Sequence, residues 1–330
     1  MRPQRIVAPV ALVLVVVLAL ALPWGLQLAG ADFYLSVASR IVVYAIAATS
    51  LNLLIGYGGM ISLGHAAFFG VGAYSTAILL SEGVQSAGLH LMVVVVVTAL
   101  VAGAIGAISL RTRGVYFIMI TLAFAQMLFY LANSIKGYGG DEGLTVRTRS
   151  LLPFDLNMQH APTFYFVALT VLALELVFLQ RFVHSRFGRA VQAVRDDEVR
   201  AEALGLPTYA CKLVVFVVAG ILCAIAGGLS VNLQGYVSPN VLHWTQSGTL
   251  MVMVILGGVG RVWGGVLGAA ALLLLQEVLA ARTPYWEFWT GWALLAVVLF
   301  ARHGLAGVPG SLAGMPALLA QWKTRLGAQR

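Results

Sequence analysis

Long apolar runs constrain this chain more than any other feature of its sequence. The runs at residues 90–110 and 212–233 are each long enough to cross a bilayer as a helix, which takes about 20 residues. Hydrophobic residues make up 60% of the 330 residues and charged residues only 10%, whereas about a quarter are charged in a soluble domain. Alternating segments typical of a membrane β-barrel are not found. The sequence therefore predicts an all-α polytopic membrane protein.

Ten apolar runs predict about ten transmembrane helices, in a single transmembrane domain that covers residues 1–330. They lie at 6–24, 37–55, 60–80, 90–110, 115–133, 163–180, 212–233, 246–258, 264–282 and 287–301. The eighth and tenth are short for a span, so we expect them to tilt, to merge with a neighbour or to stop short of the far side. The first run follows Arg2 and Arg5 and also resembles a secretory signal, but its length favours a retained helix.

Basic residues set the expected orientation. Fifteen of the twenty Lys and Arg residues fall on the same side as the N-terminus, and cytoplasmic ends carry such an excess. We therefore expect cytoplasmic N- and C-termini in the cell inner membrane. This orientation makes 134–162 an external loop and places the segment 181–212 and the basic tail 302–330 inside. The basic residues form no stripe, which argues against nucleic acid as a partner.

Missing motifs argue against an enzyme. The chain has no Gly-x-x-x-x-Gly-Lys-Ser/Thr loop, no His-Glu-x-x-His and no Cys/His cluster, so we expect no ATPase site, metal or cofactor of its own. Cys211 and Cys223 are roughly 18 Å apart along one predicted helix, too far for a disulfide.

Glu175 and Glu277 lie within predicted spans, where a carboxylate is costly. We expect Glu175 to pair with a neighbouring helix and Glu277 to face headgroups. Two such groups are few for a secondary transporter, which stays the weaker alternative.

Small residues recur at helical spacing, which is typical of helices that pack closely in lipid. They are Gly220, Ala224 and Gly228, then Gly264 and Gly268, then Gly103 and Ala107. The sequences Gly56-Tyr57-Gly58-Gly59 and Gly257-Gly258-Val259-Gly260 both fall at predicted cytoplasmic turns, but their likeness is too weak to indicate a repeat.

The stretch that begins at Gly56 is the candidate pathway. Gly56, Gly58 and Gly59 permit a break in the helix, and Ser62 and His65 follow three residues apart. One interpretation is that these residues line or gate a transmembrane pathway, since irregular backbone at membrane depth is tolerated at a cavity. The other is a cytoplasmic turn followed by a packed helix with a satisfied histidine.

The segment 185–205 predicts one amphipathic helix. Phe187, Val191 and Val194 share an apolar stripe. Asp196 with Arg200 and Arg195 with Glu198 suit pairs along the helix, and Gly205 suits its end. We expect the stripe to occupy a groove of another protein, the alternative being a solvated surface helix. The candidate residues are Phe187, Arg189, Val191, Val194, Arg195, Asp196, Glu198, Glu202 and Gly205.

Taken in order, these segments resemble the LivM-type permeases of branched-chain amino acid ABC importers. The resemblance runs through residues 40–305 and rests on the stretch Gly56–Tyr74, on Arg113-Gly114-Val115-Tyr116-Phe117, on Thr121-Leu122-Ala123-Phe124, on Gly139-Gly140 with Gly143-Leu144, on Ser185–Leu206 and on Leu256-Gly257-Gly258-Val259-Gly260 with Trp263-Gly264. It implies import of branched-chain amino acids, or of urea or short amides.

The resemblance also implies partners. They are a second related permease subunit, two ABC ATPase subunits that bind ATP and Mg, and a periplasmic or extracellular solute-binding protein. The segment 185–205 would then be the helix that couples to the ATPase. Mixed charge on the external loop suits reversible docking of the binding protein, or else marks an ordinary solvated loop. The residues are Lys136, Asp141, Glu142, Arg147 and Arg149.

Overall fold

The computed structural model describes residues 23–24, 32–151, 158–300 and 304–305, and most of them are helical. Within these ranges five helices are long and apolar enough to cross a membrane. They are α2 (Asp32–Asn52) with its π-helical continuation η1 (Leu53–Tyr57), α4 (Ala87–Ser109), α5 (Val115–Ser134), α6 (Ala161–His184) and α9 (Thr208–Gln234). Four shorter apolar helices join them: α3 (His65–Ser81), α10 (Trp244–Gly257), α11 (Gly264–Ala280) and α12 (Trp286–Phe300). The prediction of a mostly helical protein with several membrane spans is confirmed, whereas the number of about ten spans stays a prediction.

Several predicted boundaries are corrected. The first predicted span, 6–24, lies outside the described residues except for 23–24. The span predicted at 60–80 begins as a turn, and its helix, α3, starts only at His65. The span predicted at 163–180 continues as a helix to His184. Basic side chains such as Arg181 and His184 are favourable in the last turn of a helix, so they do not mark its end.

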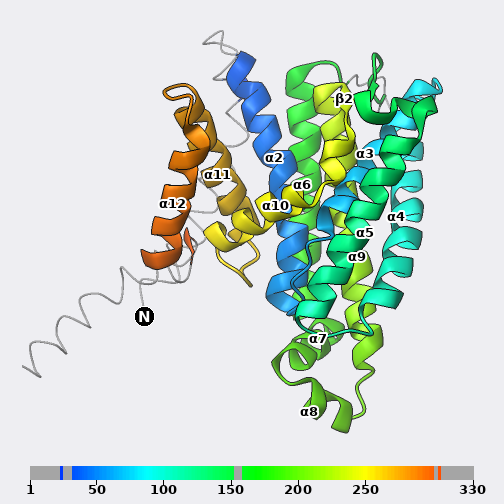
Figure 1. Ribbon diagram of the computed structural model, residues 1–330, viewed down its shortest axis with the longest axis vertical. Coiled ribbons are helices and arrows are strands. Elements are labelled where there is room, and N and C mark those ends of the chain that lie inside the picture. The colour runs from blue at the N-terminus through cyan, green and yellow to red at the C-terminus, as the bar shows by residue number, and fades with distance from the viewer. Residues whose placement is uncertain (1–22, 25–31, 152–157, 301–303, 306–330) are drawn as a thin grey trace, which may run out of the picture.

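Helix α9 lies at the centre of the bundle and packs against α3, α4 and α2 (Figure 1). A Cβ atom added at Gly227 would overlap the carbonyl oxygen of Phe69, and one at Gly228 would lie 2.7 Å from Oγ1 of Thr76. One added at Gly220 would lie 3.2 Å from the ring of Phe68. The small stripe on α9 is therefore confirmed as a packing surface. The stripe predicted at Gly103 is wrong, because among the described residues nothing lies within 4 Å of a Cβ there.

Helices α10 and α11 form a hairpin whose turn contains Gly258 (φ 114°) and Gly260 (φ 75°). A Cβ at Gly264 would overlap the Gly258 carbonyl, and one at Gly268 would overlap the Met253 carbonyl, so the predicted stripe on α11 is a packing surface too. Helix α10 has only 14 residues and runs across the middle of the bundle in Figure 1. It packs against α11 and α2, so it is the predicted short, tilted segment.

The two hydrophilic segments lie at opposite ends of the bundle (Figure 1). At one end are η2 (Lys136–Tyr138), η3 (Gly140–Glu142) and β1 (Leu144–Thr145), which pairs antiparallel with β2 (Tyr236–Val237), and η4 (Pro239–Leu242) follows. At the other end are α7 (Arg186–Asp196) and α8 (Glu198–Ala203). This placement agrees with the prediction that the two segments face different compartments. Cys211 and Cys223 are both free and buried, as predicted.

Candidate functional site

The segment predicted as one helix over 185–205 forms two helices. Asp197 takes an extended conformation between them (φ −157°, ψ 102°). Its Oδ1 accepts a hydrogen bond of 3.0 Å from the backbone N–H of Arg200, so Asp197 caps α8, as a short acidic side chain does well. The Oγ of Ser185 caps α7 in the same way, through the N–H of Gly188 at 3.0 Å. A capping aspartate in the middle of an amphipathic pattern explains why the one-helix prediction failed.

The apolar stripe of α7 faces its own chain. Val191 and Val194 are buried in the main core, and the ring of Phe187 packs edge-on against that of Phe182 at 5.6 Å. The prediction that this stripe occupies a partner's groove is therefore wrong. On α8 and just after it, Val199 and Leu204 are 72% and 75% exposed, so these apolar side chains are available to a partner.

Ion pairs fasten α8 to the membrane helices. The Nζ of Lys212, on α9, lies 2.6 Å from Oε1 of Glu198, and Nη2 of Arg113 lies 3.6 Å from the same oxygen. Oγ1 of Thr208 donates to Oε1 of Glu202 at 3.0 Å. Glu198 is thus engaged outside its own helix, and α8 is tied both to the start of α9 and to the turn between α4 and α5.

The two ion pairs predicted along the helix are wrong. Arg195 pairs with its neighbour Asp196 at 2.7 Å, and Arg200 pairs with Asp197 at 3.4 Å. The helix break at Asp197 changes the spacing on which both predictions depended. Gly205, at φ 80°, ends α8 as predicted, and its N–H donates to the carbonyl of Glu202 at 2.9 Å.

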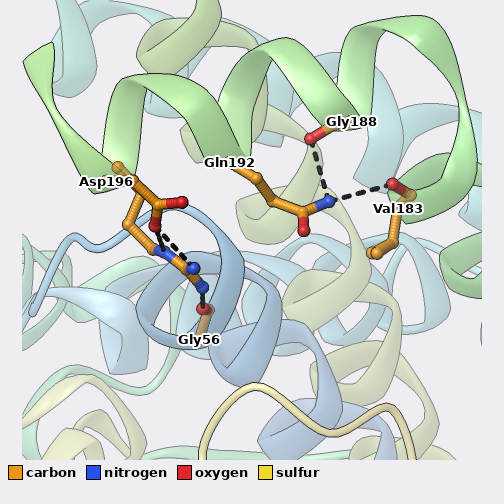
Figure 2. Close-up of polar contacts among 6 residues, drawn as sticks. Gly56, Val183, Gly188, Gln192 and Asp196 are labelled. Atoms are coloured by element: carbon orange, nitrogen blue, oxygen red, sulfur yellow. Dashed lines mark hydrogen bonds and ion pairs between the residues drawn. The ribbon is translucent and has the colours of Figure 1, made fainter.

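Arg195 joins α7 to the π-helical end of α2. Its Nη1 donates to the carbonyl oxygen of Gly56 at 2.7 Å, and Figure 2 shows this bond beside the two that Arg195 donates to Oδ1 of Asp196. A helix end leaves carbonyls without an intrahelical partner, which makes this oxygen available. A Cβ at Gly59 (φ 68°) would lie 2.6 Å from Cγ of Arg195, so Gly59 leaves room for the arginine to pass.

Gln192 fixes the corner between α6 and α7. Its Nε2 donates to the carbonyls of Val183 at 3.1 Å and Gly188 at 3.2 Å (Figure 2). Because a Cβ at Gly188 would overlap the Phe182 carbonyl, the chain can turn this closely only with glycine there. Helix α7 is thus bonded to the end of α6 as well as to Gly56.

Asn52 extends these contacts to the α10–α11 turn. Its Oδ1 accepts from the N–H of Gly260 at 2.9 Å, and its Nδ2 donates to the carbonyl of Arg261 at 2.6 Å. A Cβ at Gly56 would overlap the backbone of Gly260. The two glycine-rich segments therefore lie against each other, and continuous contacts run from α7 through Gly56 and Asn52 to this turn. Sequence reasoning missed Asn52, although a buried amide inside an apolar run was a usable signal.

His65 is buried at the start of α3 and ties it to α2. Its Nε2 lies 3.0 Å from Oγ of Ser50, while its Nδ1 has no hydrogen-bond partner among the described residues. Ser62 bonds to the N–H of Gly64 at 3.1 Å. The N–H of Ala66 donates to Oγ of Ser247 on α10 at 2.8 Å. The start of α3 therefore contacts both α2 and α10, Ser50 and Ser247 being residues that the sequence did not single out. A gating role for Ser62 and His65 stays a prediction.

The predicted external loop is folded onto the end of α9. Arg149 donates to the carbonyls of Val231, at 3.0 Å, and Asn232, and burial lowers the pKa of its guanidinium. The N–H of Ser150 donates to Oδ1 of Asn232 at 2.8 Å. Arg149 is thus engaged within the chain, whereas four of the predicted docking residues are exposed: Lys136, Asp141, Glu142 and Arg147. Their docking role stays a prediction.

The two acidic residues of the predicted spans differ from expectation. Glu277 forms an ion pair with Nη2 of Arg40 at 3.0 Å instead of facing headgroups. Glu175 is 4% exposed, and neither of its carboxylate oxygens has a hydrogen-bond partner among the described residues. The expected pairing of Glu175 is therefore wrong within these ranges, and the ion pair that forms joins helices more than 200 residues apart in the sequence.

Comparison with known proteins indicates the family of this chain. The family model described as "Branched-chain amino acid transport system / permease component" matches residues 33–301. The high-affinity branched-chain amino acid transport system permease protein LivM of Escherichia coli K12 is 27% identical over 89% of this chain and 74% of its own length. A probable branched-chain amino acid transport permease protein LivM of Methanocaldococcus jannaschii is 24% identical over 78% of this chain and 87% of its own length.

A third relative is more similar over a shorter stretch. The autoinducer 2 import system permease protein LsrC of Escherichia coli O9:H4 is 33% identical over 45% of this chain and 47% of its own length. No solved structure matches the chain. Because the family model covers most of the chain, including α7, α8 and both glycine-rich segments, the chain belongs to the family of permease components of branched-chain amino acid transport systems.

Proposed function

We propose that this chain is the permease subunit of an ABC importer that carries a small amino acid-like solute, above all branched-chain amino acids, across the cell inner membrane. Family membership and the similarity to LivM over 89% of the chain support this function. The observation that carries the mechanism is the hydrogen bond between Arg195 and Gly56. Through it a movement of α7 reaches the irregular end of α2 and, through Asn52, the α10–α11 turn.

The proposed topology has about ten transmembrane helices and cytoplasmic termini. Its support is the excess of Lys and Arg on the side of the N-terminus, together with the placement of α7 and α8 at the end opposite the external loop (Figure 1). The whole chain acts as one permease domain, with 134–162 external and 181–212 cytoplasmic. The segment 1–22 and most of the tail 302–330 lie outside the described residues.

The proposed partners are a second related permease subunit, two ABC ATPase subunits and a soluble solute-binding protein. ATP and Mg are bound by the ATPases, so this chain needs no ATPase site or cofactor. Val199 and Leu204, both largely exposed near Glu198 and Arg200, offer an apolar contact with a charged rim, which suits a protein partner.

Uptake into proteoliposomes that contain the complete complex tests this function. ATP is supplied on the side of the membrane that carries the ATPases, and the binding protein is supplied on the opposite side. We expect leucine, isoleucine or valine to accumulate on the ATPase side. Accumulation of urea or acetamide instead would favour a permease for urea or short amides. Accumulation of autoinducer 2 would favour a function like that of LsrC. Accumulation driven by an ion gradient without ATP would contradict the proposal and favour a secondary transporter.

Charge reversal on the external loop tests binding-protein docking. Arg147→Glu is expected to weaken stimulation of ATP hydrolysis by the binding protein about tenfold at low salt, because rim charges act on encounter rate. The effect should shrink near physiological salt, where the Debye length is about 8 Å. Arg282→Glu, another exposed arginine beyond α11, is the control. Equal stimulation of the Arg147 variant and the control at low salt would show that docking does not use this loop.

A further inference from the structure

A cleft of about 400 Å³ opens between α2, α10, α11 and the start of α12. Its volume lies within the range of about 300–1,000 Å³ that is typical of small-molecule sites. It is separate from the Arg195–Gly56 contacts and from the His65 region, neither of which lines it. Two of the helices around it are α10 and α11, and the turn between them is linked to α7 through Gly56 and Asn52.

The charged end of the cleft is made by Arg40 and Glu277. Their ion pair is 3.0 Å long, and the two side chains are 39% and 29% exposed. The Nε of Arg40 is buried and has no hydrogen-bond partner among the described residues. A guanidinium carries five N–H donors and binds a carboxylate best through two of them. Both charges lie within apolar helices, where ionisable groups commonly mark a solute path.

The rest of the lining combines an apolar floor with a polar wall. Met253 and Leu273 are buried and apolar. Gln246 donates through Nε2 to the hydroxyl oxygen of Tyr44 at 3.0 Å, which leaves the Tyr44 O–H proton free to act as a donor. A ligand that suits this cleft has one anionic group, one cationic group and an apolar body.

We propose that this cleft binds a zwitterionic α-amino acid with an apolar side chain. Its carboxylate contacts Arg40, its ammonium group contacts Glu277, and its side chain lies over Met253 and Leu273. In the empty cleft the two charges neutralise each other, so neither is left buried without a partner. A zwitterion replaces that one ion pair by two, while a solute with a single charge leaves either Arg40 or Glu277 uncompensated. This inference rests on the proposed function and assigns a site to it.

Protection of an engineered thiol tests the site. Ala280→Cys places a thiol at an exposed position that lines the cleft, whereas both native cysteines are buried. The complete complex in nanodiscs, without binding protein, is treated with a charged thiosulfonate, and the rate of thiol modification is measured. We expect leucine to slow this rate. We expect 4-methylpentanoate, which lacks the ammonium group, and 3-methylbutylamine, which lacks the carboxylate, to have little effect at the same concentration.

Charge-neutral variants in the same background identify the groups that bind. Arg40→Gln and Glu277→Gln are each expected to raise the leucine concentration for half-protection at least about tenfold, since each removes a charge-assisted contact. Arg40→Lys, which keeps the charge but loses the planar donors, should fall between. Arg282→Gln and Glu287→Gln, which neutralise exposed charges beyond α11 and on α12, should match the parent.

Each outcome decides the matter. If the ion pair only fastens α2 to α11, the neutral variants will lower the melting temperature and leave half-protection unchanged, which overturns the site. If those variants do not assemble, the three solutes on the parent decide alone: equal protection by all three, or by none, overturns it. A parent complex that transports leucine without such protection locates the amino acid elsewhere and leaves the proposed function intact. A parent complex that transports no amino acid contradicts the proposed function itself.

Discussion

Gly227→Val is expected to prevent this chain from folding stably in the membrane. Helices α3 and α9 are in backbone contact at this position, and a Cβ at Gly227 would overlap the Phe69 carbonyl oxygen. Overpacking usually costs about 1–3 kcal/mol when side chains can adjust, and here the obstacle is backbone inside another helix. We expect loss of most of the monodisperse protein in detergent and a strongly lowered melting temperature for the remainder.

The matched control is Gly103→Val on α4. Among the described residues nothing lies within 4 Å of a Cβ at Gly103, so this variant should express and melt like the parent. Both substitutions add a branched side chain to a glycine inside an apolar helix, and they therefore share any cost of helix propensity. Similar melting of the two variants would mean that α3 and α9 are not in backbone contact.

Arg195→Gln is expected to uncouple ATP hydrolysis from uptake. The substitution removes a charge-assisted hydrogen bond to Gly56, and bonds of this kind contribute about 1.5–3 kcal/mol. Since about 1.4 kcal/mol corresponds to a tenfold change in an equilibrium, solute transported per ATP hydrolysed should fall at least about tenfold. Val191 and Val194 still hold α7 to the core, so the folded complex and its ATPase activity should persist. Parallel assays of uptake and phosphate release in the same proteoliposomes measure the ratio.

Arg186→Gln is the control for this variant. Arg186 lies on the same helix, is exposed and is not among the candidate coupling residues, so its neutralisation changes the charge of α7 equally without touching Gly56. Arg195→Lys, which can still reach a carbonyl as a donor, should restore part of the ratio. An unchanged ratio in Arg195→Gln, or an equal loss in Arg186→Gln, would contradict a role for the Arg195–Gly56 bond.

The helical architecture could be predicted from the sequence because lipid leaves a spanning segment few alternatives to a helix. The runs at 90–110 and 115–133 agree with α4 and α5 to within a few residues. The hydrophilic segment 181–212 and the end of its helix at Gly205 were also recognised from local pattern. The family followed from motifs spread along the chain, chiefly the stretch Gly56–Tyr74, which carry information that hydropathy does not.

The details of the candidate site depend on contacts between distant residues, which local pattern does not contain. Asn52 and Gly260 are 208 residues apart, and Arg40 and Glu277 are 237 apart. Asp197 suits a solvated helix face as well as a cap, so the break between α7 and α8 was missed. The apolar stripe of Val191 and Val194 indicated burial correctly, but periodicity alone does not say whether the covering surface belongs to the same chain or to a partner.

The most direct test of the account is a distance between two spin labels, measured by pulsed electron paramagnetic resonance. One label is attached at Val259→Cys, in the α10–α11 turn, and the other at Glu82→Cys, next to α3. Both positions are exposed, and the complete complex is compared without nucleotide and with ATP trapped in the ATPases. We predict that trapping ATP shifts this distance in the parent complex and that Arg195→Gln abolishes the shift while Arg186→Gln preserves it. A shift of the same size in Arg195→Gln would contradict the claim that movement of α7 reaches the α10–α11 turn through Arg195, Gly56 and Asn52.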